Sequence, residues 1–283
     1  MRFFFQVVIL LLTFQVQSQY TQVRSYTSND GLTSNIINKV FVDSKNNLWV
    51  GSRAGLSVQK METFEIVPQT IAHKFNNIFD IAEDRQGGIW VAGYGQGVLY
   101  IKDNKSKLFT LKEGLVSNYA RTIKIIDERV YIGTLNGISI ISLKDFSIQN
   151  PKFDKAVLHD FTISSFFELQ NKIYVTTLND GIFQVLPDML VYRLPIKKAL
   201  SSTVFNGYLY IGTSKELLKI NTTTLKTVKS YPIANVWDYL IYKKHLHIVS
   251  SGVYESSSGV YQLKDDVFFN VTDNYKLGVS DLK

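Results

Sequence analysis

The residue types that most often carry out catalysis are few in this sequence. Its 283 residues include no cysteine and only four histidines. The lack of cysteine excludes thiolate nucleophiles, zinc–thiolate sites, iron–sulfur clusters and disulfides. His245 and His247 alternate along one predicted strand face and could bind a metal, but no third ligand stands near them. We therefore predict no metal site, and structural or surface roles for both histidines.

The rest of the sequence shows no catalytic centre either. The arginines are scattered, and no carboxylate pair can be chosen for glycoside hydrolysis, because the separation of such a pair is a three-dimensional property. The sequence has neither a phosphate-binding loop motif nor a dinucleotide-binding glycine motif. We expect no cofactor, and we predict that the protein is not an enzyme.

A different set of residues suits ligand recognition. Side-chain amides both donate and accept hydrogen bonds, as sugar hydroxyls do, and planar groups stack on sugar rings. For each asparagine the alternative is a cap on its own backbone. The candidate ligand-binding residues are Asn35, Arg53, Asn77, Tyr94, Gln96, Asn118, Arg121, Asn136 and Asn179. They can act together only if the fold brings their turns to one face.

The first 18 residues are predicted to be a secretory signal peptide. Arg2 supplies positive charge, residues 3–14 form an almost unbroken apolar run, and Ser18 offers a cleavage point. About 12 apolar residues are too few for a bilayer span, which needs about 20. Cleavage would leave an exported chain without a transmembrane helix. Because it has no disulfides, we expect it in the periplasm or on the cell surface of a Gram-negative bacterium.

The remainder of the chain is repetitive. A short strand with an aromatic or imidazole residue at its second position occurs six times. Its ring-bearing residues are Trp49, Trp90, Tyr131, Tyr174, Tyr210 and His247, spaced by 41, 41, 43, 36 and 37 residues. A period near 40 with short strands and turn signals is typical of a β-propeller. Neighbouring sheets of a propeller bury each other's faces, so we expect Trp49 and Trp90 to pack between sheets rather than to bind a ligand.

Each unit is predicted to hold four antiparallel strands. In the first unit these cover residues 36–42, 48–52, 55–58 and 64–67, with turn chemistry at 43–47. Gly55 begins the third strand where a turn needs positive φ, and the matching glycines of other units are Gly97, Gly137, Gly181 and Gly259. The fifth unit has Lys215-Glu216 instead, so its turn is expected to differ.

The predicted organisation is an all-β propeller over residues 19–283. The repeats lie near 31–70, 71–112, 113–155, 156–197, 198–233 and 234–272. Residues 20–27 read as an outermost strand, although the sixth unit already has its own fourth strand. We therefore predict a seven-bladed ring, in which residues 20–27 and a partial seventh unit at 273–283 belong to the last blade, interrupted before it is complete.

The first unit resembles the repeat of the two-component regulator propeller family. The resemblance rests on residues 30–35, 40–43, 48–52 and 55–57, which read DGLTSN, VFVD, LWVGS and GLS. The second and third units share parts of the pattern, and the later units are degenerate. The second unit's turn at 84–90 also resembles the Asp-box hairpins of sialidase propellers, which are structural.

The resemblance implies the periplasmic sensor region of hybrid two-component systems of Bacteroidetes-type bacteria, many of which are implicated in sensing oligosaccharides. This chain has no kinase motif or output domain. We expect a ligand-sensing, oligosaccharide-binding propeller, whose partners are an oligosaccharide, a kinase or receptor, or a second copy of itself. The net charge of +7 would favour an acidic glycan. A protein-interaction scaffold is the alternative, a glycan-active enzyme is a weaker one, and export argues against nucleic acid.

Overall fold

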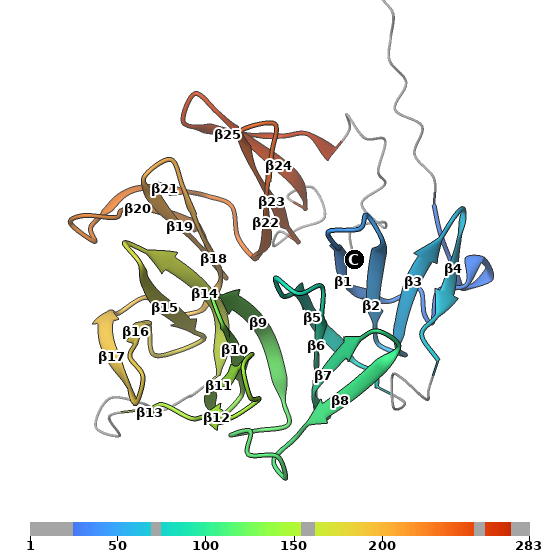
Figure 1. The fold of residues 1–283 in the computed structure, drawn as a ribbon. Coiled ribbons are helices and arrows are strands. Elements are labelled where there is room, and N and C mark those ends of the chain that lie inside the picture. Colours follow the sequence, from blue (N-terminus) through green and yellow to red (C-terminus); the bar gives the residue numbers. More distant parts are fainter. Residues whose placement is uncertain (1–24, 69–74, 154–161, 252–257, 273–283) are drawn as a thin grey trace, which may run out of the picture.

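The protein is described by a computed structural model that covers residues 25–68, 75–153, 162–251 and 258–272. Six sheets stand around a central axis like the blades of a propeller (Figure 1). Four core strands of each blade follow one another along the chain, from the innermost to the outermost, and pair antiparallel. The predicted six-unit β-propeller is therefore confirmed, and no seventh blade occurs in the described ranges.

The first three blades follow the predicted plan. Blade 1 holds β1 (Ile37–Val42), β2 (Leu48–Ser52), β3 (Leu56–Lys60) and β4 (Thr63–Ile66). Blade 2 holds β5 (Ile78–Glu83), β6 (Ile89–Gly93), β7 (Gly97–Lys102) and β8 (Lys105–Phe109). Blade 3 holds β9 (Ala120–Ile126), β10 (Arg129–Thr134), β11 (Gly137–Ser142) and the two-residue β12 (Ile148–Gln149).

The last three blades have the same order with one addition. Blade 4 holds β14 (Ile163–Leu169), β15 (Lys172–Thr177), β16 (Ile182–Val185) and β17 (Met189–Leu194). Blade 5 holds β18 (Ala199–Phe205), β19 (Tyr208–Thr213), β20 (Leu217–Asn221) and β21 (Thr227–Tyr231). Blade 6 holds β22 (Val236–Tyr242), β23 (His245–Ser250), β24 (Gly259–Lys264) and β25 (Val267–Asn270). A fifth strand in blade 4, β13 (Lys152–Phe153), pairs parallel to β17 and was not predicted.

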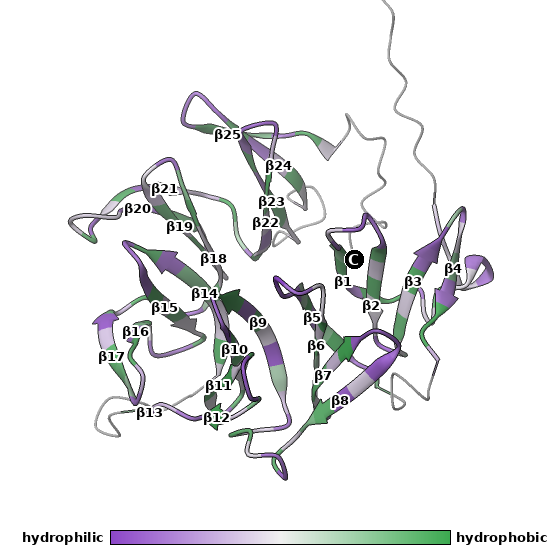
Figure 2. Cartoon of the chain, viewed as in Figure 1, coloured by the Kyte–Doolittle hydropathy of each residue, from purple (hydrophilic) through white to green (hydrophobic). Residues whose placement is uncertain are grey.

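The hydrophobic core lies between blades, as expected for sheets that are too small to be stable alone. Trp90 is fully buried among residues of blades 2 and 3, and Trp49 packs against the core between blades 1 and 2. Figure 2 shows hydrophobic colouring along the strands and hydrophilic colouring in turns such as that between β7 and β8. The predicted packing role of Trp49 and Trp90 is thus confirmed.

An aspartate organises the turn between the first and second strands of blades 1 and 2. In blade 2, Asp84 accepts hydrogen bonds from the backbone amides of Gln86 and Gly88 and from the Trp90 indole, each at 2.9 Å. Asp43 bonds the Trp49 indole in the same way, at 2.9 Å. The carboxylate fixes the turn and at the same time satisfies the indole N–H that inter-blade packing buries. This geometry shows a structural role for the predicted Asp-box-like turn.

In the fifth unit, the turn between the second and third strands lacks the glycine of the other units but forms the same hydrogen bond. The predicted glycines all have positive φ, and at Gly97 (φ 84°) an added Cβ would overlap the Phe109 carbonyl oxygen. In the fifth unit Thr213 closes the turn by donating its hydroxyl to the Glu216 carbonyl oxygen, 2.8 Å away, as Thr134 does to Gly137 at 2.9 Å. The fifth turn therefore differs in backbone conformation and not in bonding.

The described part of the predicted N-terminal strand is not a strand. Residues 25–27 are irregular, and Thr27 caps the short 3₁₀-helix η1 (Ser28–Asp30) through reciprocal bonds with Asp30. Tyr26 meets Phe64 of blade 1 edge-on, with ring centroids 5.1 Å apart. Capping and this aromatic contact hold the segment against blade 1. Residues 20–24, the signal peptide 1–18 and the partial unit 273–283 lie outside the described residues.

Blades 6 and 1 meet at a seam that differs from the other blade junctions. Lys39 of β1 and Asp238 of β22 form an ion pair across it, with 3.2 Å between the charged atoms. Val40 of β1 nevertheless remains 57% exposed, although Ile81, the corresponding residue of β5, is only 2% exposed. On the other side of the seam Leu240 is 60% exposed. The Lys39–Asp238 ion pair thus links the two blades next to the channel. Val40 and Leu240, farther along the same inner strands, remain in contact with solvent.

Candidate functional site

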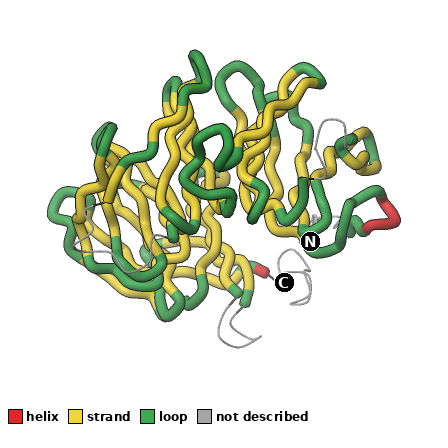
Figure 3. Tube along the Cα trace, turned by 90° about the horizontal axis from the view of Figure 1, so that it is seen from below, coloured by secondary structure: helices red, strands yellow, loops and turns green. Residues whose placement is uncertain are grey.

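One face of the propeller collects the loops that precede the inner strands and the turns that follow the second strands. Backbone bonds tie the two sets together: the Tyr94 amide donates to the Asn77 carbonyl at 3.0 Å, and the Leu135 amide donates to the Tyr119 carbonyl at 3.2 Å. Equivalent bonds occur in the other blades. We call this the entrance face. Figure 3, turned by 90°, shows strands running between loops on the two faces of the molecule.

Every inner strand has a β-bulge just inside the entrance face. The register shifts after the first residue in blades 1, 2, 4, 5 and 6, and opposite the last residue of β10 in blade 3. A bulge leaves one residue outside the ladder and redirects its side chain. The bulged residues are Asn38, Phe79, Arg121, Ser164, Leu200 and Trp237. They form one equivalent set around the channel mouth.

Aromatic rings and an arginine cluster at this mouth between blades 2 and 3. Phe79 stacks on Tyr94 with ring centroids 5.2 Å apart, and Tyr94 meets Tyr119 edge-on at 5.0 Å. The Arg121 guanidinium carbon lies 5.4 Å from the Phe79 ring centroid, within cation–π range. Tyr119 is 45% exposed. We call these four residues the mouth cluster, a planar and partly polar surface that is open to solvent.

The structure places all nine predicted residues on the entrance face, in its loops or turns or at the bulge of β9. It brings two of them, Tyr94 and Arg121, into the mouth cluster, where both contact Phe79. The other seven are Asn35, Arg53, Asn77, Gln96, Asn118, Asn136 and Asn179. Ligand binding by any of the nine stays a prediction.

Several of the predicted amides bond the chain's own backbone. Asn35 accepts from the Ser28 amide at 2.7 Å, and Asn118 accepts from the Leu111 amide at 2.8 Å, each seven residues away. Gln96 accepts from the backbone amide of the residue that precedes Asn77, at 2.7 Å. These oxygens stabilise loops, so the alternative role considered for turn amides applies to them.

Three aromatic residues of this face were not among the predicted site residues. They are Phe79, Tyr119 and Trp237. Phe79 and Trp237 are bulged residues, and in a simple period-2 reading they would have been assigned to a sheet face. The signal that could have found them is their shared position, directly after the first buried residue of each inner strand.

Electrostatics at the mouth centre on Lys39. Its ammonium lies 3.3 Å from an Asp80 oxygen and 3.2 Å from an Asp238 oxygen, so it joins blades 6, 1 and 2. The Asp80 charge outweighs burial and, with Asp238, raises the pKa of Lys39. The second Asp80 oxygen accepts from the Ile123 amide of blade 3 at 2.8 Å. Polar links thus run around the channel across four blades.

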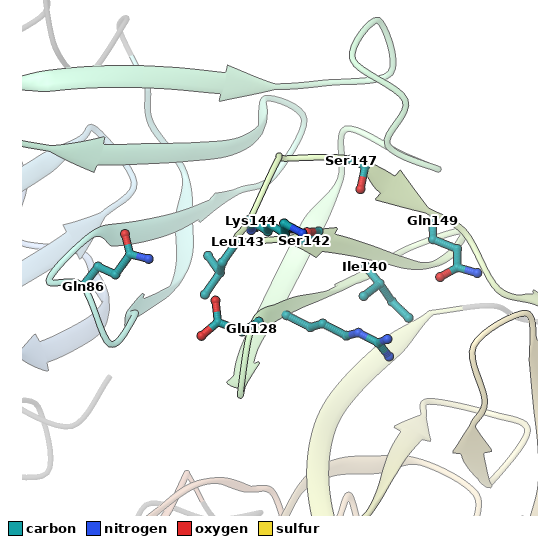
Figure 4. A pocket seen from close by; sticks show the side chains of 9 residues that line it. Gln86, Glu128, Ile140, Ser142, Leu143, Lys144, Ser147 and Gln149 are labelled. Atoms are coloured by element: carbon teal, nitrogen blue, oxygen red, sulfur yellow. Dashed lines mark hydrogen bonds between the residues drawn. The ribbon is translucent and has the colours of Figure 1, made fainter.

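Two pockets of the described residues lie on the opposite face. One of about 810 Å³ is bordered by turn residues of blades 2 and 3, including Gln86, Glu128 and Lys144 (Figure 4). Arg129 lines both this pocket and one of about 790 Å³ that extends to blade 4. Both are open and carry mixed charges. Neither contains a predicted ligand-binding residue.

The described residues offer no metal centre. No three His, Cys, Asp or Glu residues among them are grouped as ligands. His247 is buried where Trp90 stands in blade 2, and its Nδ1 has no hydrogen-bond partner, whereas His245 is exposed. Across the same described ranges, no helix has the length and hydrophobicity needed to cross a membrane.

Comparison with known proteins agrees with this fold. The model of the two component regulator propeller family matches residues 31–54 and 73–95, in blades 1 and 2. No curated protein matches the sequence significantly. The extracellular domain of the putative hybrid two component system BT4673 from B. thetaiotaomicron superposes with a TM-score of 0.67 at 16% identity, covering 83% of this chain and 33% of that one.

Two further structures share the architecture. PorZ, a surface component of the type-IX secretion system of Porphyromonas gingivalis, has a TM-score of 0.59 at 10% identity, covering 84% of this chain and 33% of PorZ. YCF48 bound to D1 peptide has a TM-score of 0.62 at 11% identity, covering 86% and 82%. The chain spans a third of the length of the first two structures. This protein is a six-bladed β-propeller whose first two blades carry two-component regulator propeller repeats.

Proposed function

We propose that this protein is the ligand-sensing propeller of an exported two-component receptor, and that it binds an oligosaccharide at the entrance face. The observation that carries the proposal is the mouth cluster. Exposed Tyr119 offers a flat apolar surface with a hydroxyl at its edge, and Arg121 places a cation over the Phe79 ring of the same cluster. Sugar rings combine apolar faces with hydroxyl edges, and such sites bind them by stacking and directed hydrogen bonds.

Four cationic side chains of the entrance face favour an acidic sugar, while Asp180 and Glu216 stand in turns of the same face. Arg53, Arg121, Lys198 and Lys215 stand on the loops and turns of this face or at its bulges. Lys39 contributes little, because Asp80 and Asp238 compensate its charge. A uronic-acid oligomer would pair its carboxylates with the arginines, which bind carboxylates in bidentate fashion. Such binding should weaken as salt is raised.

Periplasmic location and receptor membership belong to the same proposal. Repeats of the matched family and the likeness to an extracellular two-component domain support them. A kinase or receptor chain would read out the bound state. The predicted signal peptide over residues 1–18 would supply export.

The test is a binding screen with purified chain. Oligogalacturonates and neutral cello-oligosaccharides are titrated by calorimetry, with thermal shift as a second readout. We expect the acidic series to bind, and Tyr119→Ala with Arg121→Gln to abolish binding without loss of the fold. Lys144→Gln, at the pocket on the opposite face, is the matched control and should bind normally. A folded wild-type chain that binds neither series contradicts the proposal.

A protein-interaction scaffold is the second candidate function. The propeller of YCF48, which this chain resembles over most of both lengths, is described as bound to a peptide. Exposed apolar side chains on blade 6, among them Leu240, Tyr242 and Phe269, would suit such a partner. Loss of a co-purifying receptor chain in Leu240→Ser, with sugar binding absent in the wild type, would favour this function.

A seven-bladed ring, with a further blade at the seam, is the alternative to the six-bladed arrangement on which this proposal is built. The exposed Val40 favours it, since the corresponding Ile81, Ile123 and Phe166 of blades 2 to 4 are buried by a neighbouring blade. A seventh blade would separate Lys39 from Asp238. Because the chain has no native cysteine, Lys39→Cys with Asp238→Cys and a short thiol cross-linker tests the arrangement. Efficient intramolecular cross-linking would contradict a seventh blade.

A further inference from the structure

Trp237 is unusual among the three tryptophans of this protein. Trp90 is fully buried, whereas Trp237 is 50% exposed. Its indole nitrogen donates to the Ser251 hydroxyl at 2.9 Å, which fixes the ring without covering it. A large aromatic side chain that is held in one orientation and half exposed to solvent is typical of a binding surface.

Trp237 and Ser251 repeat in blade 6 the pair that forms the base of the mouth cluster in blade 2. Trp237 is the bulged residue of β22, as Phe79 is the bulged residue of β5. Ser251 follows β23, as Tyr94 follows β6. In blade 2 the two side chains stack, and in blade 6 they are joined by a hydrogen bond. The same two positions thus present an aromatic ring to the entrance face in both blades.

The two aromatic residues, Phe79 and Trp237, lie on either side of blade 1, and Lys39 of that blade contacts the aspartate that follows each of them. The residue after Phe79 is Asp80, and the residue after Trp237 is Asp238. Both carboxylates lie within 3.3 Å of the same Lys39 ammonium. The inner strands of blades 6, 1 and 2 therefore converge at the mouth, with blade 1 contributing exposed Asn38 at the equivalent bulge.

We infer that Trp237 is a second stacking platform, and that the ligand is a linear oligosaccharide long enough to lie across blade 1 from the mouth cluster to Trp237. This inference rests on the proposed function and extends it with a new contact residue and a minimum ligand length. A short sugar occupies the mouth cluster alone, and each further unit along the arc approaches the indole. Arg53 of blade 1 stands on the same face between the two platforms.

Tryptophan fluorescence provides a direct test. Trp49→Phe leaves the buried Trp90 and the exposed Trp237 as emitters, and the signal that is lost in Trp49→Phe/Trp237→Phe is the contribution of Trp237. Digalacturonate and hexagalacturonate are titrated into this variant and into Trp49→Phe/Trp237→Phe. We expect hexagalacturonate to shift and protect the emission from acrylamide only where Trp237 is present, and digalacturonate to leave it unchanged.

Affinity gives a second readout in the otherwise native chain. Trp237→Ala should weaken hexagalacturonate about tenfold, the equivalent of one aromatic stacking contact, and leave digalacturonate unaffected. Ser251→Ala removes only the bond that orients the ring, and should weaken the hexamer less. Equal hexamer affinity in wild type and Trp237→Ala, with no fluorescence response, overturns the inference while the proposed function stands. Absence of binding by both oligomers to the wild type overturns both.

Discussion

Removal of the Asp84 carboxylate should destabilise the propeller far more than removal of Asp43, although both hold the same kind of turn. Asp84→Ala leaves two buried donors, the Trp90 indole and the Gly88 amide, without an acceptor. A buried donor without a partner costs about 1–3 kcal/mol. The expected loss of unfolding free energy is therefore about 2–6 kcal/mol.

Asp43→Ala removes equally short hydrogen bonds from a more open turn. Its partners Trp49 and Asn47 are partly exposed, so water can replace the lost acceptor. The expected loss is about 1 kcal/mol, the net contribution of an ordinary hydrogen bond. For a chain of this size each kcal/mol lowers Tm by about 2–4 °C. Differential scanning calorimetry should therefore show a fall of about 10 °C for Asp84→Ala and about 3 °C for Asp43→Ala.

The two variants differ mainly in how deeply the donors left without an acceptor are buried, and this burial should set the loss of unfolding free energy. Asp84→Asn should fall between the wild type and Asp84→Ala, because its amide keeps one acceptor oxygen but presents an N–H₂ group on the other side. Equal falls in Tm for Asp84→Ala and Asp43→Ala would refute the reasoning, since they would show that exposure of the partners does not set the cost.

Two further predictions concern a glycine turn and an ion cluster. Gly97→Ala should lower Tm strongly, because its Cβ would overlap the Phe109 carbonyl oxygen. Gly207→Ala has free space around the new Cβ and should cost only the strain of a left-handed backbone, about 1–2 kcal/mol. Equal losses in calorimetry would contradict this difference. The hydrogen bond from Lys219 lowers the pKa of Asp266, so its stabilisation is complete above about pH 4 and is lost as the pH falls. Asp266→Asn should therefore lower Tm at pH 7, and this deficit should shrink progressively only as the pH falls well below 4. A deficit that stays the same down to the lowest pH at which the protein is folded would argue against the contacts of Asp266 with Lys219 and Lys229.

Much of the fold follows from local patterns. In blade 1 the predicted strands agree with the observed ones to within about one residue at most ends. Alternation of apolar residues and Asp-Asn turn chemistry act within a few residues of each other, so a sequence reading captures them. The unpredicted β13 is different, because it pairs with β17 more than 30 residues away, outside the consecutive four-strand order of the blade.

The location of the candidate site could be predicted from the sequence better than the residues that form it. The turn that carries Tyr94 and the start of the inner strand that carries Arg121 follow from the propeller order alone. Phe79 and Tyr119 escaped because a bulge alters the alternation by one residue, and because contact between blades joins rings that are far apart in sequence. Asn35 and Asn118 were chosen for their chemistry, but their neighbours in the loop use their oxygens.

The contiguous strand order of each blade has a consequence for how such proteins change over time. The four core strands of every described blade come from one unbroken stretch of chain, and the described residues show no exchange of a strand between blades 6 and 1. Duplication or deletion of one whole repeat would leave the remaining hydrogen-bond ladders intact and would only move the seam. Blade number is therefore a quantity that mutation can alter in single steps, and the Lys39–Asp238 ion pair is a contact that each step would have to rebuild.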